Sequence, residues 1–378
     1  MRIAMLGWEF PPFKSGGLGV HCYELTRAFA SKGVEVDFYM PRTEFEMKGT
    51  TPRLIQVMPV YFGPYTAREA YGADFMGRVM QYNMHCAEQV AKNHREKHYD
   101  LIHNHDWLTA KAGILAKQKI HRPHVMTVHS TEYDRSSLGP NQQILAIESE
   151  GVHAADRVIT VSHMMKRQLT DKFGADCSRI RVVYNGVDPD KFKKKWDVKK
   201  YSKEKVVLFL GRMAEQKGPV QFLQAARKVL SVMKNARFVM AGGGDMLPYL
   251  INYSIELGIS DRVTFLGYIP ESQLQDAYAK SDVYVLPSVS EPFGITALEA
   301  MSSGTPIILS KTSGVSEITT HCLKVDFWDV DKMAEYIIAL LRYRVLNHTM
   351  GKYEVEDARR FSWGKAADET LKVYGELV

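Results

Sequence analysis

The chain has 378 residues, of which 45% are hydrophobic and 24% charged, and its formal net charge is +6. At about 150 residues per domain, this length predicts two domains or one large one, and the composition excludes a wholly disordered chain. The positive excess is thin over such a length, so we expect no nucleic-acid partner. We also expect no transmembrane segment, because no apolar run reaches the roughly 18 residues that a membrane span needs.

Two features of the sequence predict a cytoplasmic location. The N-terminal segment MRIAMLGWEFPP does not fit a signal peptide, because its apolar run is short and is interrupted by Glu9. The cysteines Cys22, Cys86, Cys177 and Cys322 are far apart and form no C-x-x-C pair. We therefore expect buried thiols in a reducing compartment, and neither disulfides nor a zinc–cysteine site.

The first half of the chain alternates short apolar runs with amphipathic stretches of helical length. A helix is expected at 18–31, and the apolar runs predict buried strands at 2–6, 34–40, 100–106, 124–129, 157–162 and 179–186. Continuous apolar strands that alternate with helices are typical of a parallel sheet covered on both faces. We therefore expect an α/β domain over residues 1–187.

A second α/β domain is expected over residues 188–360. It begins with a stretch rich in lysine (188–205), for which a solvated connection is favoured over a patch that binds an acidic partner or nucleic acid. The expected strands lie at 206–211, 237–242, 262–267, 283–288 and 306–310, and the expected helices at 220–233, 247–257, 271–280 and 295–303. The last helix, in 361–378, often returns to the first domain in proteins of this kind.

Ligands of open parallel sheets bind at the carboxyl ends of the strands, so residues directly after strands are the candidates for chemistry. KSGGLG (14–19) follows the first strand and opens a helix. Its backbone N–H groups and Lys14 suit an anion, although glycines needed for a turn explain the same pattern. The spacing of Gly7 and the later glycines does not match the G-x-G-x-x-G fingerprint of a dinucleotide-binding domain.

Two further loops follow strands of the second domain. The loop 211–218 carries Arg212 and Lys217, a planar donor fork and a mobile ammonium that together suit a diphosphate. The segment GGGD (242–245) precedes a helix, and Asp245 fits either an N-cap or a position close to a ligand.

The segment 290–300 (SEPFGITALEA) is the most specific pattern. Glu291 follows a strand, and Glu299 lies within an apolar stretch of the next helix. A carboxylate among apolar residues needs a partner, such as a ligand hydroxyl or a basic side chain. Paired carboxylates also serve in retaining glycosidases, so hydroxyl recognition and hydrolysis both remain open here.

Histidines gather after two strands of the first domain. His103 and His105 share one face of a strand and are followed by Asp106, while His129 ends the next strand. These side chains are suitable metal ligands. We favour hydrogen bonding to a sugar and expect no metal, because the spacing matches no established metal motif.

The order of these motifs gives the chain a family resemblance. It rests on KSGGL (14–18), HNHDW (103–107), the loop 211–218, and EPFGITALE (291–299), which is similar to an E-x7-E signature. The chain resembles the retaining nucleotide-sugar glycosyltransferases of family four, close to bacterial and archaeal glycogen and starch synthases. The resemblance implies the GT-B fold, two Rossmann-like domains facing a cleft, with the acceptor on the N-terminal domain and the donor on the C-terminal one.

The resemblance also implies roles for individual residues. Arg212 and Lys217 would neutralise the leaving diphosphate, while Glu291 would bind donor-sugar hydroxyls and Glu299 the ribose. His129 would lie beneath the sugar, with Asp106 near the reacting centre and the acceptor. The other implied donor contacts are Lys14, Gly16, Gly17, Leu18, Tyr268, Ile269, Phe293, Gly294 and Ile295. No metal and no other cofactor is implied, because arginine and lysine supply the positive charge.

The implied function is transfer of a hexose, most simply glucose, from ADP- or UDP-sugar to a glucan or another sugar acceptor. The first domain is shorter than that of the large glycogen synthases, which leaves a small or lipid-linked acceptor as an alternative. A non-catalytic nucleotide-sugar binding protein is a further alternative, and an oxidoreductase is disfavoured by the missing fingerprint. The sequence does not specify the donor base or the oligomeric state.

Overall fold

The computed structural model describes residues 1–12, 16–42, 52–61, 73–136, 139–192 and 204–378. These residues form two compact units. The first comprises Met1–Asn185 together with Trp363–Val378, and the second comprises Gly186–Ser362. The divisions therefore fall at Asn185 and Ser362, where the sequence predicts 187 and 360.

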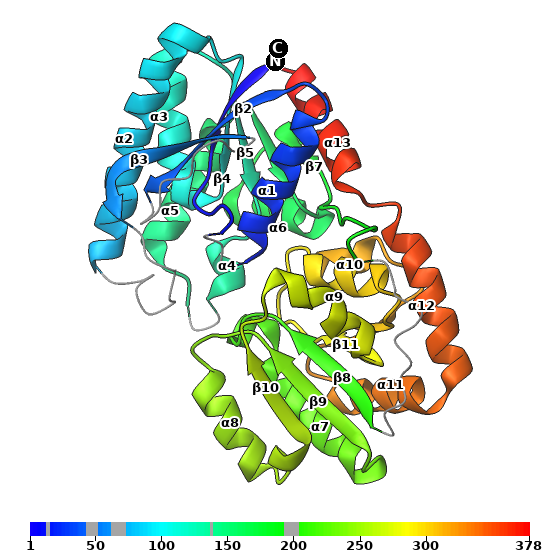
Figure 1. The fold of residues 1–378 in the computed structure, drawn as a ribbon. Helices are drawn as coiled ribbons and strands as arrows, with labels where there is room; N and C mark the ends of the chain where they lie inside the picture. The colour runs from blue at the N-terminus through cyan, green and yellow to red at the C-terminus, as the bar shows by residue number, and fades with distance from the viewer. Residues whose placement is uncertain (13–15, 43–51, 62–72, 137–138, 193–203) are drawn as a thin grey trace. The chain divides into compact units, whose positions relative to one another are not determined.

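The described part of the first unit contains a parallel sheet with helices on both faces (Figure 1). Its strands are β1 (Arg2–Leu6), β2 (Glu35–Arg42), β3 (Arg53–Tyr61), β4 (Leu101–His105), β5 (His124–Val128), β6 (Arg157–Thr160) and β7 (Ile180–Val182). Its helices are α1 (Gly17–Ala30), α2 (Ala73–Lys97), α3 (Ala110–Ile120), α4 (Glu132–Arg135), α5 (Gln142–Ala154), α6 (His163–Phe173) and α13 (Trp363–Gly375). The predicted strand at 179–186 is reduced to β7.

Strand β3 is absent from the predicted elements. It lies at the edge of the sheet and pairs with β2, with Asp37 opposite Arg53 at the start of the register. Its sequence contains Pro59, which argues against a strand because proline cannot donate to the ladder. An edge strand tolerates a proline, and its edge position is not visible in the local pattern.

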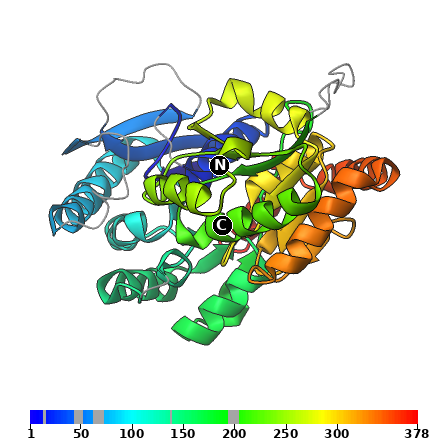
Figure 2. The same ribbon diagram turned by 90° about the horizontal axis from the view of Figure 1, so that it is seen from below.

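The C-terminal helix α13 belongs to the first unit, where it packs against α1. Its apolar face is buried, and the Tyr374 hydroxyl lies 2.6 Å from Nδ1 of His103 in β4. Beyond the helix, Glu376 pairs with Arg157 and Arg181, which lie on β6 and β7. The two chain ends therefore both lie on this unit (Figures 1 and 2).

The second unit is built in the same way around a parallel sheet. Its strands are β8 (Lys205–Leu210), β9 (Ala236–Ala241), β10 (Val263–Gly267), β11 (Val283–Leu286), β12 (Ile307–Ser310) and β13 (Leu323–Val325). Its helices are α7 (Pro219–Val232), α8 (Leu247–Glu256), α9 (Glu271–Lys280), α10 (Ile295–Ser302), α11 (Val330–Arg342) and α12 (Arg344–Ala358). The short strand β13 is missing from the predicted elements.

Aromatic packing holds the second sheet against its helices. Phe222 of α7 packs against Phe209 of β8 and Phe238 of β9, with ring centroids 5.5 Å apart in each pair. All three rings are fully buried. Burial of such side chains contributes roughly 1.5–3 kcal/mol each, so this contact fixes α7 on the sheet and with it the loop that leads into α7.

Each sheet contains one position at which the order of its strands reverses. The orders are β3-β2-β1-β4-β5-β6-β7 and β10-β9-β8-β11-β12-β13. In both, the chain leaves the first strand in one direction and later returns to its other side, which is the arrangement of Rossmann domains. The order reverses between β1 and β4 and between β8 and β11. Ligands of such sheets bind outside the carboxyl ends of the strands at this point.

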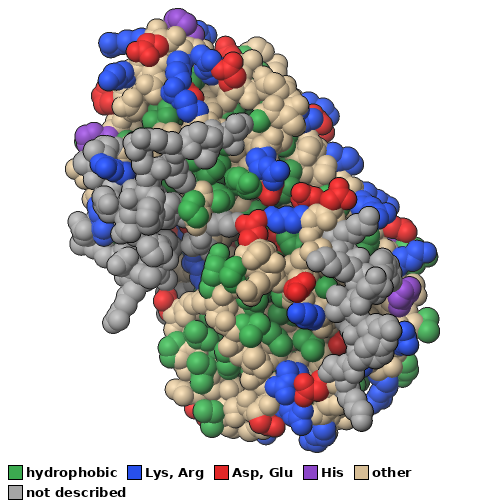
Figure 3. Space-filling view, viewed as in Figure 1, with side chains coloured by type: hydrophobic (Ala, Val, Ile, Leu, Met, Phe, Trp, Pro, Cys, Tyr) green, Lys and Arg blue, Asp and Glu red, His purple; other side chains and the backbone are tan. Residues whose placement is uncertain are grey.

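The helices, the surface charges and the cysteines can each be compared with what the sequence predicts. Among the described residues, no helix is both long and apolar enough to span a bilayer. On the face drawn in Figure 3, lysine and arginine side chains lie interspersed with acidic ones. Cys22 and Cys86 are buried, whereas Cys177 is exposed and Cys322 half-buried, so the expectation of buried thiols is wrong for Cys177. It lies in a short turn before β7, outside the core.

His124 shows how buried histidines make folding depend on pH. It begins β5, is fully buried, and bonds through Nε2 to Oδ1 of Asn104 at 2.6 Å. Burial lowers the pKa of His124 to about 3. Between that value and an unfolded pKa near 6.5, the unfolded chain binds a proton that the folded chain does not. The folded state therefore loses stability as the pH falls through this window.

We predict that His124→Gln weakens this pH dependence. Below the unfolded pKa, the wild type loses about 1.4 kcal/mol per pH unit through this one side chain, and the variant does not. Thermal unfolding between about pH 7 and pH 5 measures the difference. The control is His85→Gln, at an exposed position of α2, which keeps the wild-type slope. An unchanged slope in His124→Gln would contradict the assignment.

Candidate functional site

The loop after β8 carries the two predicted cations of the second unit. It runs over residues 211–218 and ends at Gly218, which caps α7 with φ +68°. A Cβ at Gly218 would lie 2.0 Å from the carbonyl oxygen of Pro287, in the loop after β11. Glycine is therefore required for this close approach. Lys217 is half-buried beside it, and Arg212 is exposed.

Lys217 and Glu291 form an ion pair across the point where the strand order reverses. Nζ of Lys217 lies 2.5 Å from Oε2 of Glu291, and the Ser288 hydroxyl donates to the same oxygen at 3.3 Å. The exposed fraction is 23% for the lysine side chain and 9% for the glutamate. The backbone joins the same two loops, because Val289 N–H donates to the Gln216 carbonyl at 2.9 Å.

This burial decides what the pair can do. A charge that is largely removed from water is costly once it loses its partner. Lys217 will therefore release Glu291 most readily to a ligand that brings a negative charge of its own. Glu291, when released, will accept hydrogen bonds from a ligand's hydroxyl groups. The arrangement suits a ligand that carries both an anionic group and hydroxyl groups.

The loop after β9 contacts the loop after β8. A Cβ on Gly242 would lie 1.9 Å from the carbonyl oxygen of Gly211, so the two backbones touch where a side chain cannot fit. The residue that caps α8 is Met246, so Asp245 is not the N-cap. Asp245 is exposed instead.

Glu299 has the partner that its apolar surroundings require. The Tyr278 hydroxyl, on α9, donates to Oε2 of Glu299 at 2.7 Å, and both side chains are buried. Burial, together with the charge of Glu299, raises the pKa of Tyr278 well above its usual value, so the hydroxyl remains a donor. Sequence reasoning missed Tyr278, because it lies in an ordinary amphipathic helix with no motif to mark it.

The other predicted donor contacts lie at helix starts and strand ends. The Phe293 side chain is buried, and the Phe293 carbonyl accepts a hydrogen bond from Val315 N–H at 2.7 Å. Gly294 (φ +106°) is the N-cap of α10, which begins at Ile295, and Gly16 is the N-cap of α1, which begins with Gly17 and Leu18. Tyr268 (68% exposed) and Ile269 follow β10. Lys14 lies outside the described residues.

Asp106 adopts a backbone conformation that is rare for a residue with a side chain. It follows β4 with φ +56° and ψ −179°, close to a region populated almost entirely by glycine. Its Oδ1 accepts a hydrogen bond from the His129 N–H at 2.6 Å, which ties the end of β4 to the end of β5. Burial raises the pKa of Asp106 to about 6. Strain of this kind clusters at functional sites, which supports the predicted importance of Asp106.

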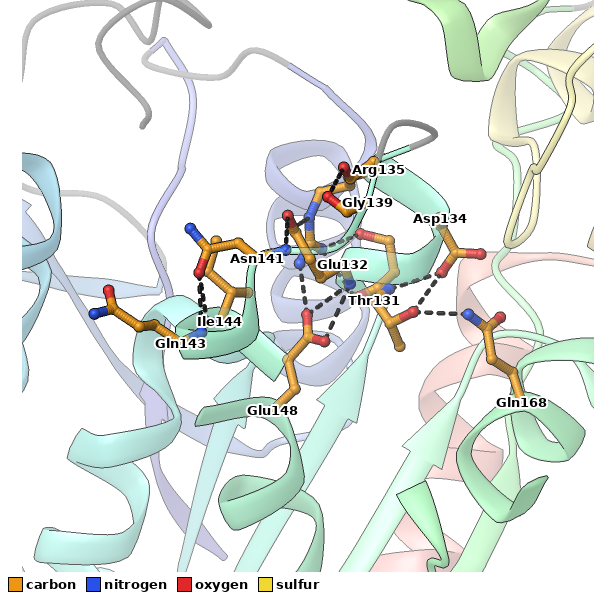
Figure 4. Close-up of polar contacts among 12 residues, drawn as sticks. Thr131, Glu132, Asp134, Arg135, Gly139, Asn141, Gln143, Ile144, Glu148 and Gln168 are labelled. Carbon is orange, nitrogen blue, oxygen red and sulfur yellow. Dashed lines mark hydrogen bonds and ion pairs between the residues drawn. The ribbon is translucent and has the colours of Figure 1, made fainter. Parts of the chain in front are cut away.

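A buried acid–base network braces the segment after His129 (Figure 4). Glu148 of α5 accepts hydrogen bonds from the Glu132 N–H at 3.0 and 3.1 Å and pairs with Arg135 at 2.5 Å. Arg135 also donates to the hydroxyl and carbonyl oxygens of Ser130. Burial raises the pKa of Glu148 to about 7 against the opposing effect of Arg135. The network fixes the backbone on which His129 is carried.

His103 and His105 lie on one face of β4, as predicted, with ring centroids 4.3 Å apart. They have different partners. His103 is engaged at both ring nitrogens, by Tyr374 at 2.6 Å and by Thr127 at 2.7 Å. His105 instead lies with Nδ1 3.0 Å from Nε2 of His129.

His21 joins this group from α1, and sequence reasoning missed it. Its ring centroid lies 4.4 Å from that of His129 and 5.5 Å from that of His105. Burial lowers the pKa of His129 to about 3 and the pKa values of His21 and His105 well below the usual value, so the imidazoles are neutral at pH 7. The available signal was its place beside Cys22 and Leu25 on the side of the first helix that is buried.

Comparison with known proteins identifies the family. The model "Glycosyltransferase Family 4" matches residues 15–191, and "Glycosyl transferases group 1" matches residues 190–357. An uncharacterized glycosyltransferase of Methanocaldococcus jannaschii is 33% identical over 99% of this chain and 98% of its own length. The chain belongs to glycosyltransferase family 4. The resemblance predicted from the motifs is thereby confirmed.

Other relatives of this glycosyltransferase carry names that describe different activities. D-inositol 3-phosphate glycosyltransferase of Mycolicibacterium smegmatis is 30% identical over 100% of this chain and 91% of its own length. Glycogen synthase of Mycobacterium tuberculosis is 28% identical over 84% of this chain and 80% of its own length.

Solved structures confirm the predicted fold of this glycosyltransferase, two Rossmann-like domains of the GT-B type. Sucrose-phosphate synthase of Thermosynechococcus elongatus matches with a TM-score of 0.85 at 23% identity, over 100% of this chain and 98% of that one. Anabaena HepE in complex with UDP and glucose matches with a TM-score of 0.79 at 18% identity, over 100% of both chains. Starch synthase IV of Arabidopsis thaliana, bound to ADP and acarbose, gives 0.75 at 18% identity over 99% of both.

The contact between Gly218 and Pro287 generates a prediction with an internal control. Gly258 has nearly the same φ, +67°, but a Cβ there meets nothing within 4 Å. In Gly258→Ala only the left-handed backbone angle opposes the new side chain, so the free energy of unfolding falls by about 1–2 kcal/mol. We predict that Gly218→Ala loses more, because it must also separate the two loops that carry Lys217 and Glu291.

Urea unfolding of both variants measures these losses. The expected result is a lower midpoint for Gly218→Ala than for Gly258→Ala. Equal midpoints would contradict the view that the close approach, rather than the backbone angle, makes glycine necessary at 218.

Proposed function

We propose that this glycosyltransferase is a retaining hexosyltransferase that uses a nucleoside-diphosphate sugar, most simply ADP- or UDP-glucose. The observation that carries the proposal is the Lys217–Glu291 ion pair at the point of strand-order reversal. A nucleoside-diphosphate sugar brings a diphosphate, which needs cations, and sugar hydroxyls, which need acceptors. Lys217 supplies the cation and Glu291 the hydrogen-bond acceptor, and the two side chains lie together. The complexes of HepE with UDP and of starch synthase IV with ADP support a donor of this class.

Positive charge at the leaving group is the catalytic contribution that we assign to Lys217 and Arg212. When the bond between the sugar and the diphosphate breaks, negative charge grows on the phosphate oxygens. A cation held in position stabilises this charge more than it stabilises the ground state. The diphosphate would take the place of Glu291 as the partner of Lys217, so the lysine remains paired throughout the reaction.

We assign sugar recognition to Glu291 and nucleoside recognition to Glu299. Glu291, released from Lys217, would accept hydrogen bonds from hydroxyl groups of the hexose. Glu299 would accept them from the ribose, in an orientation fixed by Tyr278. The donor contacts assigned to Gly294, Ile295, Tyr268 and Ile269 follow the same family roles, as does the backbone of Phe293.

In the first unit we assign contact with the transferred sugar to His129 and proximity to the acceptor to Asp106. Gly16, Gly17, Leu18 and Lys14 keep their assigned roles at the donor. The departing phosphate would accept the proton of the acceptor hydroxyl on the face that it leaves, which gives retention without an enzyme nucleophile. The transfer needs no metal or other cofactor in this proposal, because Lys217 and Arg212 supply the positive charge.

Two acceptor classes are the candidates. A glucan follows from the glycogen and starch synthases among the relatives and neighbours. A small phosphorylated acceptor follows from the D-inositol 3-phosphate glycosyltransferases, which align along all of this chain. Because the second group aligns over more of this chain, a small phosphorylated acceptor is as strong a candidate as a glucan. A lipid-linked sugar is a further small acceptor.

A panel of donors and acceptors tests the function. The protein is incubated with ADP- and UDP-linked glucose, galactose and mannose, each with maltooligosaccharides or inositol phosphate, and the released nucleotide and the product anomer are measured. We expect nucleotide release that depends on the acceptor and a product anomer that matches the donor. Donor binding without transfer would favour a non-catalytic binding protein, and an inverted product would contradict retention.

Removal of the lysine charge tests the mechanism. Lys217→Met keeps the length of the side chain and removes its charge, so we predict a fall in kcat of about 10²–10³ with a smaller change in the KM of the acceptor. The matched control is Lys228→Met, which removes another paired lysine of the same unit, 2.6 Å from Asp331 on its surface. A kcat in Lys217→Met equal to that of the control would contradict the assigned role.

A further inference from the structure

Ser313, in the loop after β12, carries a hydroxyl that is buried without a hydrogen bond from the described residues. The residue is 1% exposed, and its Oγ has no hydrogen-bond partner in the part of the chain that the structure describes. A polar group that is removed from water and left unpaired costs free energy. Because a serine hydroxyl can donate one hydrogen bond, an acceptor that comes within its reach removes this cost.

The backbone places Ser313 directly beside Glu291. The Glu291 N–H donates to the Thr312 carbonyl at 3.0 Å, and the Gly314 N–H donates to the Glu291 carbonyl at 2.8 Å. These two hydrogen bonds make Glu291 and Ser313 the two members of a parallel bridge. Segments paired in this way are about 4.7–4.9 Å apart, and because their pleats are in phase, opposite residues leave the backbone on the same face.

The Glu291 carboxylate is the acceptor beside this hydroxyl. It is engaged at Oε2, which lies 2.5 Å from Nζ of Lys217 and 3.3 Å from the Ser288 hydroxyl. In the proposed reaction the donor diphosphate replaces Glu291 as the partner of Lys217. A carboxylate that is only 9% exposed then needs other hydrogen-bond donors. It can reach Ser313 by rotation about the bonds of the Glu291 side chain, because the two backbones are already adjacent.

We propose that Ser313 is a positioning residue for the donor sugar: its hydroxyl donates to the Glu291 carboxylate once the diphosphate has taken Lys217. This inference rests on the proposed function, since it needs a ligand that separates the ion pair. Ser313 and the hexose hydroxyls together replace the lysine as hydrogen-bond donors to Glu291. The carboxylate thereby keeps the orientation in which it accepts from the sugar.

The loop that carries Ser313 is fixed by contacts that remain when the ion pair separates. The Thr312 hydroxyl donates to the Ser288 carbonyl at 2.9 Å, and the Val315 N–H donates to the Phe293 carbonyl at 2.7 Å. Neither contact involves a side chain of the ion pair. A hydroxyl held in place in this way loses little conformational entropy when its new hydrogen bond forms.

A role limited to the fold predicts a loss of stability that the proposal does not. The hydroxyl removed in Ser313→Ala has no partner among the described residues, so we expect the midpoint of urea unfolding without ligand to stay at or slightly above the wild-type value. The matched control is Ser303→Ala. Ser303 is also fully buried, and its hydroxyl likewise has no partner in the described part of the chain. It caps the carboxyl end of α10, whereas Glu291 precedes the amino end.

Binding of nucleotide sugars to the full chain tests the proposal. ADP-glucose and UDP-glucose are titrated by calorimetry without an acceptor. For each one that the wild type binds, we expect Ser313→Ala to lower the affinity about tenfold, because a hydrogen bond to a charged group is lost. Ser303→Ala keeps the wild-type affinity. In a Glu291→Ala background, Ser313→Ala has no further effect, because the acceptor of its hydrogen bond is gone.

Wild-type affinity in Ser313→Ala would overturn the proposal, as would an equal tenfold loss in the Glu291→Ala background or a urea midpoint below that of Ser303→Ala. These results differ from a failure of the proposed function, in which the wild type itself binds neither nucleotide sugar and the role of Ser313 falls with it. Where Glu291→Ala does not fold, the affinities of Ser313→Ala and Ser303→Ala decide between the two roles.

Discussion

The ion pair between Lys217 and Glu291 is the interaction on which the site in the second unit depends. The strand order brings the loops after β8 and β11 side by side, and Gly218 lets their backbones approach more closely than a side chain would permit. The two charges then meet at 2.5 Å, largely out of water. A buried pair of this kind costs desolvation in the absence of ligand. A ligand that places an anionic group beside Lys217 and hydroxyl groups beside Glu291 offsets this desolvation.

The first unit repeats the strand order with a different chemistry. The loops after β4 and β5 of this unit carry neutral histidines and a strained aspartate rather than cations. Burial keeps the imidazoles uncharged, and the Glu148–Arg135 network behind them fixes the backbone. In the proposed reaction, Lys217 and Arg212 of the second unit supply positive charge to the leaving group, and the histidines and Asp106 of the first unit supply polar contacts to the sugar and the acceptor. Two similar sheets can carry different chemistry because the functional side chains lie in the loops rather than in the sheets themselves.

The sequence was informative where a side chain's role depends on its neighbours along the chain. Buried parallel strands are continuous apolar runs, so β1 and β11 were predictable, as was the need of Glu299 for a partner. The identity of that partner, Tyr278, depends on how α9 packs beside α10, and no local pattern encodes it. The same is true of His21 and Asn185, which meet across 164 positions of sequence. Strands β3 and β13 were missed because one contains a proline and the other has three residues.

A crystal structure of the full chain with UDP or ADP bound is the most direct test of this account. The account predicts that diphosphate oxygens lie within hydrogen-bond distance of Nζ of Lys217, at about 3 Å, and that Glu291 has left the lysine. A nucleotide bound elsewhere on the chain, with the Lys217–Glu291 pair intact, would contradict it.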